Sequence, residues 1–460
     1  MNSYLITSTK KSSGKSIITI GLTAVLNSMM YKLSVFKKGP DYIDPLWISK
    51  SAKTNCYNLD FNTMSLQEIK SLYKQKTSIS DINIVEGNKG LFDGVSLDGS
   101  DSNAALAKLL KLEIILVIDC AGITRGIAPL INGYQQFDSK LKYKGIILNN
   151  IASDRHERKI INAVNEYSDF KVFGSVYKSK KLEILEQHLG LQPSFTKSNS
   201  YNIIKNISSV IKSSIDMKYL LKDIKIKKQS PITASISTKK KYTDIKIGIP
   251  IDNAFGFYYA DDLEKIKSFG AKIIFFNTLK DKSIPKVDAL FIGGGFPELV
   301  AHELSSNNKM MESIKKFIEA NKPVYAECGG LMYLAKSIKI NKKTFKMVGV
   351  INARVAMNSK PIGRGHVELT TLPAHPWLKS NDIINTHEFH YSDILLNTKT
   401  SEFTYKVKRG YGINGKYDGI KYKNLMATYS HLRDTKKTNW IENYLKFIKN
   451  TKDNETKKHI

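Results

Sequence analysis

Short apolar runs, most of them bounded by glycine, aspartate or asparagine, recur along the chain at intervals that leave room for a helix between them. A strand buried on both faces has this appearance, because neither face needs polar residues. In the first part of the chain the runs lie at 3–7, 83–85, 114–118 and 145–148. The same rhythm restarts later, at 245–249, 272–276, 289–292 and 323–326. The sequence therefore predicts an α/β protein with two parallel-sheet domains.

The segment 215–243 lacks this rhythm and carries serine, threonine and lysine instead. A chain of 460 residues is too long for one ordinary core, so a linker is expected here. We predict a first domain over 1–214, a linker over 215–243, a second domain over 244–450 and a basic tail over 451–460. Of the two lysine clusters, 239–241 is assigned to the linker and 446–458 to a solvated end.

The formal net charge of +29 suggests that the protein could bind nucleic acid. The lysines, however, are spread along the whole chain and accompany many asparagines and isoleucines, which is typical of a compositional bias. We therefore expect no nucleic-acid partner. A positive field of this kind can still raise the local concentration of a polyanionic small substrate.

Nothing in the sequence predicts secretion or a membrane span. The first residues show no basic segment ahead of an apolar stretch, so no signal peptide is expected. The longest apolar runs are far shorter than the ~20 residues that cross a bilayer. Three scattered cysteines, Cys56, Cys120 and Cys328, fit neither a disulfide framework nor a zinc cluster. A cytoplasmic location is the expectation.

The first strand leads into a phosphate-binding motif. The loop 8–16 ends in Gly14, Lys15 and Ser16, directly before an apolar-periodic helix expected over 15–30. In a P-loop, backbone N–H groups cradle phosphates, the lysine reaches the terminal phosphates and the hydroxyl ligates Mg²⁺. A lysine-rich loop can produce these three letters by chance, but the position between strand and helix favours a nucleotide site.

Two acidic segments follow predicted strands of the same domain: GPDYIDP at 39–45 and EGNKGLFDG at 86–94. Ligands bind at the carboxyl ends of parallel strands, so we expect Asp41, Glu86 and Asp93 near Ser16. Hard oxygen ligands are what Mg²⁺ requires, and Ser16, Asp41 and Glu86 are the predicted ligands. Asp119, which ends the run 114–118, resembles the Walker-B acid of P-loop proteins. We rank it below Glu86 as a candidate for the Mg²⁺ site. Any single aspartate of this kind can instead be a turn or a helix cap.

In the second domain, Cys328 lies between a predicted strand and Gly329–Gly330. A cysteine on a sharp strand-to-helix turn is presented at a helix N-terminus, where we expect the dipole to lower the thiol pKa. Gly329 and the upstream glycines Gly294 and Gly295 can supply N–H donors to an oxyanion. His431, after a late apolar segment, is the candidate base. A lone cysteine is more often an inert core residue, but this surrounding pattern favours a nucleophile.

A second group of histidines, in HEFHYS at 387–392, suggests metal ligands at first sight. No further cysteine or histidine stands at ligand spacing, and the segment alternates like a strand. We therefore expect no metal there.

Taken together, these segments resemble the cobyrinic acid a,c-diamide synthase family of glutamine-dependent amidoligases. The resemblance runs from the P-loop to His431. It is carried by the segments 39–45, 86–94, 145–149 with 155–156, 293–298, 327–330, 387–392 and 428–431.

The resemblance implies a dethiobiotin-synthetase-like P-loop domain followed by a class I glutamine amidotransferase domain. It implies that Cys328 is the glutaminase nucleophile, activated by His431, and that Gly14, Lys15 and Ser16 bind ATP and Mg²⁺. Asp41, Tyr42, Glu86 and Asp93 would serve the synthetase site. The implied partners are L-glutamine and a polycarboxylate corrin, whose a and c carboxylates are phosphorylated and then amidated in cobalamin biosynthesis.

Three positions depart from the family pattern. Ser8 replaces the first P-loop glycine, Ile48 stands where many relatives have histidine, and Arg433 stands where class I glutaminases carry the glutamate that orients the histidine. The last departure predicts a Cys–His dyad. Alternatives stay open: the same chemistry on hydrogenobyrinic acid or nickel sirohydrochlorin, or a partitioning-type P-loop switch ATPase. The oligomeric state is also open, with a homodimer among the options.

Overall fold

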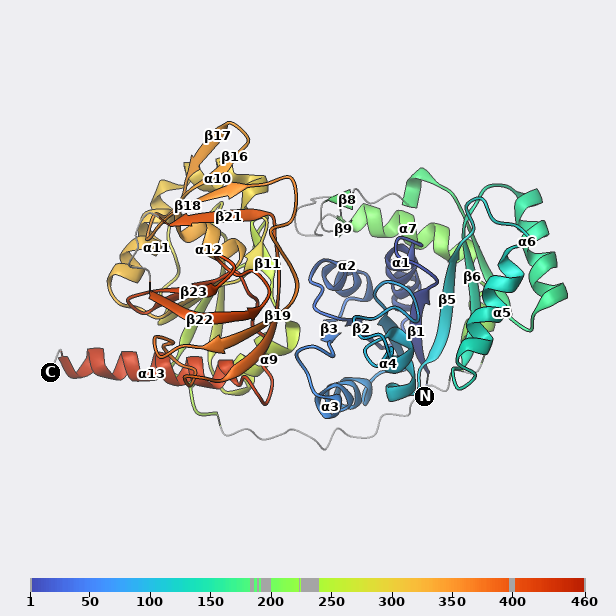
Figure 1. Ribbon diagram of the computed structural model, residues 1–460, viewed down its shortest axis with the longest axis horizontal. Coiled ribbons are helices and arrows are strands. Elements are labelled where there is room, and N and C mark those ends of the chain that lie inside the picture. Colours follow the sequence, from blue (N-terminus) through green and yellow to red (C-terminus); the bar gives the residue numbers. More distant parts are fainter. Residues whose placement is uncertain are drawn as a thin grey trace. The chain divides into compact units, whose positions relative to one another are not determined.

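The computed structural model describes residues 2–182, 186–187, 190–191, 200–222, 224, 240–396 and 402–458 (Figure 1). Most of the expected linker, 225–239, and the last two residues of the expected tail lie outside these ranges. The chain divides into two compact units, Met1–Ser235 and Ile236–Ile460. The boundaries expected from the sequence stay a prediction.

The first unit is built on a seven-stranded sheet in the order β3-β2-β4-β1-β5-β6-β7, with every neighbouring pair parallel. The parallel sheet predicted from the apolar runs is confirmed. Its strands are β1 (Ser3–Ser8), β2 (Leu33–Lys38), β3 (Cys56–Leu59), β4 (Ile82–Glu86), β5 (Glu113–Asp119), β6 (Tyr143–Ile151) and β7 (Val172–Tyr177).

Helices connect these strands by crossovers (Figure 1). They are α1 (Lys15–Ser28), α2 (Ile43–Ala52), α3 (Leu66–Thr77), α4 (Asn103–Leu110), α5 (Ile127–Phe137), α6 (Asp154–Tyr167), α7 (Ser200–Ser214) and α8 (Met217–Leu221). Helix α1 packs closely on α7, because a Cβ at Gly21 would lie only 2.3 Å from the Ile211 side chain. Helix α8 falls inside the segment expected to be linker, and its Leu220 is buried. The first unit thus extends beyond residue 214.

The second unit holds a nine-stranded mixed sheet in the order β12-β10-β13-β15-β24-β23-β22-β19-β20. Its first five strands are parallel, as predicted for four of them: β10 (Lys246–Pro250), β12 (Lys272–Phe276), β13 (Ala289–Ile292), β15 (Val324–Glu327) and β24 (Leu425–Thr428). The other four are antiparallel: β19 (Gly363–Thr371), β20 (Ile383–His390), β22 (Glu402–Arg409) and β23 (Tyr417–Tyr422).

Smaller elements surround this sheet. A four-stranded sheet contains β16 (Ala335–Ile340), β17 (Lys343–Lys346), β18 (Ile351–Met357) and β21 (Ser392–Leu396), and a short pair joins β11 (Phe255–Phe257) to β14 (Gly294–Gly295). The helices are α9 (Ala260–Ser268), α10 (Ala301–Ser306), α11 (Asn308–Glu319), α12 (Gly329–Leu334) and α13 (Trp440–Lys458).

The expected solvated end belongs to helix α13, in which residues 451–457 are half-buried or exposed. Residues 451–458 continue the helix, and Lys452 lies 3.2 Å from Asp288 Oδ1. At the other end of α13, Trp440 and Tyr444 are fully buried against Tyr325. The apolar start of α13 belongs to the core, which explains why the helix persists. Among the described helices, none is long and apolar enough to cross a membrane.

Candidate functional site

The loop between β1 and α1 forms a tight phosphate-type cradle. Gly14 adopts a left-handed conformation (φ +89°) immediately before the helix, and a Cβ at this position would lie 2.2 Å from Asn149 Nδ2. The Asn149 amide in turn donates to the Ser13 carbonyl at 3.0 Å. Only glycine adopts this left-handed conformation readily and also leaves room for the Asn149 side chain. The N–H groups at the start of α1 are thereby held in place for an anion.

Four charged or hydroxyl side chains meet beside this loop. Ser16 Oγ lies 2.8 Å from Glu86 Oε1 and 3.2 Å from Asp44 Oδ2. The Lys37 ammonium, 3% exposed, donates to Asp44 Oδ2 at 2.5 Å and to Glu86 Oε1 at 2.7 Å. The start of α1, the ends of β2 and β4 and the first turn of α2 thus converge at the carboxyl ends of the strands, where parallel sheets bind ligands.

Burial governs the titration of this cluster. Glu86 is fully buried and its pKa is raised by burial, although Lys37 partly offsets the effect. For Asp44 the balance is the reverse: burial is the largest single influence and opposes ionisation, but the charge of Lys37 and the hydrogen bonds with Lys37 and Glu86 together lower the pKa. Burial acts to lower the pKa of Lys37, yet the charges of Asp44 and Glu86 raise it well above its ordinary value. The cluster therefore holds an ammonium between two carboxyl groups whose pKa values shift in opposite directions. Burial, followed by the nearby Lys37, lowers the pKa of Lys15.

Asp44 occupies the place that the sequence reasoning gave to Asp41. The Asp41 carboxylate accepts the backbone N–H groups of Ile43 (2.9 Å) and Asp44 (3.2 Å), which caps the start of α2. Asp44 lies on that first helical turn and faces Ser16. Burial and the charge of Asp44 raise the pKa of Asp41 to about 7, although 35% of its side chain is exposed. Tyr42, between them, is 9% exposed.

Two other predicted acids lie outside the Ser16 cluster. Asp93 Oδ2 accepts the Gly90 N–H at 2.9 Å, within the loop after β4. Asp119, at the end of β5, pairs with Lys10 at 3.1 Å and accepts from Asn150 at 2.8 Å. The sequence reasoning missed Lys37 and Asp44. The second carboxylate of the GPDYIDP segment was the signal for Asp44, since it follows Asp41 by one helical turn.

The donor set at Ser16 fits Mg²⁺ bound together with a nucleotide. One oxygen of Glu86, Oε2, is buried without a hydrogen-bond partner, and Ser16 and Asp44 add further hard oxygens. Within the described ranges no group of three or more histidine, cysteine, aspartate or glutamate side chains is arranged to hold a metal alone. Mg²⁺ is ordinarily held by one or two carboxylates plus phosphates, so this incomplete protein shell is suitable.

In the second unit, Cys328 forms the expected elbow between β15 and α12. Its backbone has φ +47° and ψ −102°, a strained conformation for a non-glycine residue, and its N–H donates to the Thr428 carbonyl at 2.7 Å. Strain of this kind is what a strand-to-helix nucleophile turn requires. The side chain is 6% exposed, and its Sγ lies 3.9 Å from the Phe389 carbonyl.

The three glycines predicted around the thiol lie together. A Cβ at Gly329 would be 3.1 Å from the Gly295 backbone nitrogen, so the residue after Cys328 contacts the loop that follows β13. A Cβ at Gly294 would be 2.5 Å from His431 Cε1. The glycine loop thus touches the cysteine turn on one side and the imidazole on the other.

His431 follows β24 and is held from three sides. Its N–H donates to the His387 carbonyl at 2.9 Å, and the two imidazoles stack with centroids 4.9 Å apart. His431 Nδ1 lies 3.3 Å from Glu327 Oε2. Burial, followed by the proximity of His431, lowers the pKa of His387, so this second ring stays neutral.

Two expectations for this centre were wrong. A carboxylate does face the histidine: Glu327 replaces the partner thought to be missing, while Arg433 is buried elsewhere against Asp261 (2.7 Å) and the Tyr259 ring (4.5 Å). The thiol pKa is raised rather than lowered, because Cys328 is buried and Glu298 lies nearby. The six-residue helix α12 is too short for its dipole to outweigh that burial.

The HEFHYS segment forms a wall of the same centre, as the strand predicted from its alternation. Its first four residues end β20 beside His431 and Cys328. His390 stacks on Tyr429 at 3.8 Å and bonds to the Ser392 carbonyl at 2.9 Å through Nδ1. Glu388 accepts the N–H groups of Tyr411 and Gly412.

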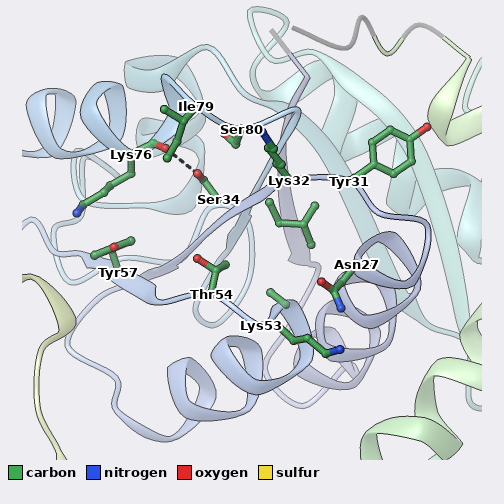
Figure 2. A pocket seen from close by; sticks show the side chains of 12 residues that line it. Asn27, Tyr31, Lys32, Ser34, Lys53, Thr54, Tyr57, Lys76, Ile79 and Ser80 are labelled. Atoms are coloured by element: carbon green, nitrogen blue, oxygen red, sulfur yellow. Dashed lines mark hydrogen bonds between the residues drawn. The ribbon is translucent and has the colours of Figure 1, made fainter. Parts of the chain in front are cut away.

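A pocket of about 350 Å³ lies at the opposite end of α1 from Gly14, between the ends of α1, α2 and α3. Three lysines line it, but Figure 2 shows the Lys53 and Lys76 ammonium groups pointing to opposite sides. Lys76 instead lies over the Tyr57 ring at 4.3 Å. Because these lysines do not converge, they do not form an anion site. The pocket is therefore not part of the P-loop site at the other end of α1.

Comparison with known proteins links both units to described families. Residues 4–191 match the family described as CobQ/CobB/MinD/ParA nucleotide binding domain. Residues 246–438 match the family described as CobB/CobQ-like glutamine amidotransferase domain.

Relatives match over nearly the whole length of the chain. The cobyrinate a,c-diamide synthase of Magnetococcus marinus is 37% identical over 433 residues, which cover 93% of this chain and 93% of that protein. The protein of the same name from Picrophilus torridus is 37% identical and covers 94% of this chain and 95% of its own. That from Methanosphaera stadtmanae is 34% identical, with 94% and 95% covered.

Proposed function

The chain belongs to the cobyrinate a,c-diamide synthase family, and on that premise we propose that it uses ATP and glutamine to amidate the a and c carboxylates of cobyrinic acid. One observation carries the proposal. The same chain contains a P-loop beside buried carboxylates and a strained cysteine turn beside a carboxylate-paired histidine. The first arrangement activates an acid with a nucleotide, and the second releases ammonia from an amide.

In the glutaminase half, Cys328 attacks the side-chain amide carbon of glutamine and His431 takes the thiol proton. Because burial keeps the free thiol protonated, the transfer to His431 is needed at the moment of attack. Backbone N–H groups at Gly329 and in the Gly294–Gly295 loop stabilise the oxyanion. The imidazolium then protonates the leaving ammonia, and water hydrolyses the thioester to glutamate.

In the synthetase half, Lys15 and the N–H groups at the start of α1 bind the ATP phosphates. A carboxylate of the macrocycle attacks the terminal phosphate and becomes an acyl phosphate, because a free carboxylate is a poor acyl donor. Ammonia displaces the phosphate to give the amide. Ser16, Asp44 and Glu86 would hold Mg²⁺, which neutralises charge on the phosphates when it is bound. The ammonia is transferred without entering bulk water, where it would become ammonium.

The test separates the two halves with one variant in each. Cys328→Ala should lose glutamine-dependent synthesis and keep synthesis from high ammonia. Glu86→Gln should lose synthesis from both nitrogen sources. If Cys328→Ala retained full glutamine-dependent synthesis, the proposal would fail.

The macrocycle is identified by offering each candidate in turn. Cobyrinic acid, hydrogenobyrinic acid and nickel sirohydrochlorin are incubated with ATP and glutamine, and each acid-to-amide conversion is read from the product mass. We expect conversion of cobyrinic acid at two positions. If hydrogenobyrinic acid or nickel sirohydrochlorin were converted preferentially, the proposed reaction would stand but that macrocycle would be the substrate.

A further inference from the structure

We propose that Glu327 is the positioning residue of His431, a role that rests on the glutaminase half of the proposed function. Glu327 Oε2 lies 3.3 Å from His431 Nδ1. Both side chains are almost completely buried, at 2% and 4% exposure. In this chain the orienting carboxylate therefore comes from the residue before the nucleophile, not from the residue two after the histidine, where Arg433 stands.

The Glu327 carboxylate is itself fixed. Its Oε1 accepts the Tyr325 hydroxyl at 2.5 Å and the Leu432 N–H at 2.9 Å. Tyr325 stacks on Phe291 at 5.2 Å with an interplanar angle of 11°. One carboxylate oxygen is thus locked by the core and by the backbone that follows His431, which leaves the other oxygen for the imidazole.

The surroundings of His431 favour an acceptor at Nδ1. A carboxylate there accepts the Nδ1–H and leaves Nε2 unprotonated, which is the tautomer that can take a thiol proton. It also stabilises the imidazolium that results. The ring that stacks on His431 is the neutral His387, whose pKa is also lowered by the charges of His366 and Arg433. Among these neighbours Glu327 is the anion in contact with the imidazole.

Glu327→Gln separates this role from that of a structural clamp. The glutamine keeps an oxygen for Tyr325 and Leu432 but presents an NH₂ donor to Nδ1. The imidazole must then accept at Nδ1 and carry its proton on Nε2, which is the wrong tautomer for deprotonating Cys328.

The matched control is Asp262→Asn. The Asp262 carboxylate is buried and accepts the Asp434 N–H at 3.2 Å and Trp440 Nε1 at 3.2 Å. It therefore holds the same segment after His431 without contacting the imidazole. Burial, followed by the charge of Asp261, raises the pKa of Asp262 far above its usual range, so asparagine mimics its protonated form.

The experiment uses the full chain and measures glutaminase kcat and KM across pH, with ammonia-dependent synthesis measured in parallel. Glu327→Gln should lower glutaminase kcat by about 10²–10⁴-fold with little change in KM. The pH profile of its glutaminase kcat should differ from that of wild type, because the imidazole no longer faces an anion. Ammonia-dependent synthesis should stay within about twofold of wild type, and Asp262→Asn should leave both activities and the profile in place.

Two results would overturn the assignment. One is a Glu327→Gln enzyme with glutaminase kcat within about threefold of wild type and an unchanged pH profile. The other is a parallel loss of glutamine- and ammonia-dependent synthesis, which marks a structural clamp. A wild-type enzyme without glutaminase activity would instead refute the proposed function, so the two failures are distinguishable.

Discussion

The buried ammonium of Lys37 is the feature of the first unit whose removal gives the most informative result. Its Nζ lies 2.7 Å from Glu86 Oε1 and 2.5 Å from Asp44 Oδ2, and the Glu86 side chain has no exposed surface. Lys37→Met keeps most of the side-chain volume and deletes the charge. Two carboxylates then share a buried space with the Ser16 hydroxyl.

The magnitude follows from the burial of these groups. Removing one partner of a buried ion pair costs about 3–5 kcal/mol, because the remaining charge is uncompensated. At roughly 2–4 °C per kcal/mol for a unit of this size, the melting temperature should fall by about 6–20 °C at pH 8.

The penalty should depend on pH. Without Lys37, burial raises the pKa of Glu86 further above its unfolded value. A raised carboxyl pKa destabilises the fold progressively as the pH rises from the unfolded pKa to the folded pKa. The cost should therefore be smaller at pH 5.5 than at pH 8.

Thermal and denaturant unfolding of the full chain at pH 8 and pH 5.5 measures this difference. Lys108→Met is the control, because Lys108 pairs with Asp138 at 2.6 Å on the surface, where such pairs contribute about 0–1 kcal/mol. The reasoning would be refuted by a Lys37→Met penalty below about 1 kcal/mol at pH 8, or by equal penalties at both pH values.

Three further outcomes are expected. Gly14→Ala should weaken ATP binding, measured by equilibrium dialysis, because φ is +89° and Asn149 would lie 2.2 Å from the new Cβ; Gly133→Ala, with open space around it, should not. Glu298→Gln should shift the pH dependence of Cys328 alkylation to lower pH, because the nearby carboxylate helps to raise the thiol pKa. Chelation of divalent cations should abolish synthesis from ammonia as well as from glutamine, measured by product mass.

Eight of the parallel strands could be predicted because burial on both faces leaves an uninterrupted apolar run, whereas β2, β3, β7 and β24 were not among the predicted runs. The antiparallel half of the second sheet could not, apart from the end of β20 (Ile383–His390), which the alternation at 387–392 indicated. Strands such as β22 (Glu402–Arg409) and β19 (Gly363–Thr371) are partly exposed and carry lysine, arginine and glutamate, so their composition is that of a surface segment. Their pairing depends on partners distant in the sequence.

Individual site residues were predictable where a local motif fixes the backbone, as at Gly14 and Cys328. Contacts between distant segments were not. The role of Lys37 depends on its contacts with Asp44 and Glu86, which lie on other elements. Similarly, no local sequence feature indicates that Glu327 contacts His431. The direction of the thiol pKa was wrong because a helix terminus was weighed without the burial around it.

The raised thiol pKa and the Glu327–His431 contact together predict how Cys328 reacts. An isolated thiolate in this buried place would be costly. Transfer of its proton to His431 instead creates an imidazolium between the thiolate and the Glu327 carboxylate, so the net charge of the three groups does not change. Reaction should therefore wait for a ligand that accepts the attack while the proton moves.

Iodoacetamide should inactivate glutamine-dependent synthesis slowly at pH 7, whereas an electrophilic glutamine analogue that reaches the Gly294–Gly295 loop should inactivate it much faster at equal concentration. Glutamate, as a competitor, should protect against the analogue. Rapid inactivation by iodoacetamide at pH 7, with a profile that follows an ordinary thiol pKa, would show that the free enzyme already holds an accessible thiolate and would contradict this account.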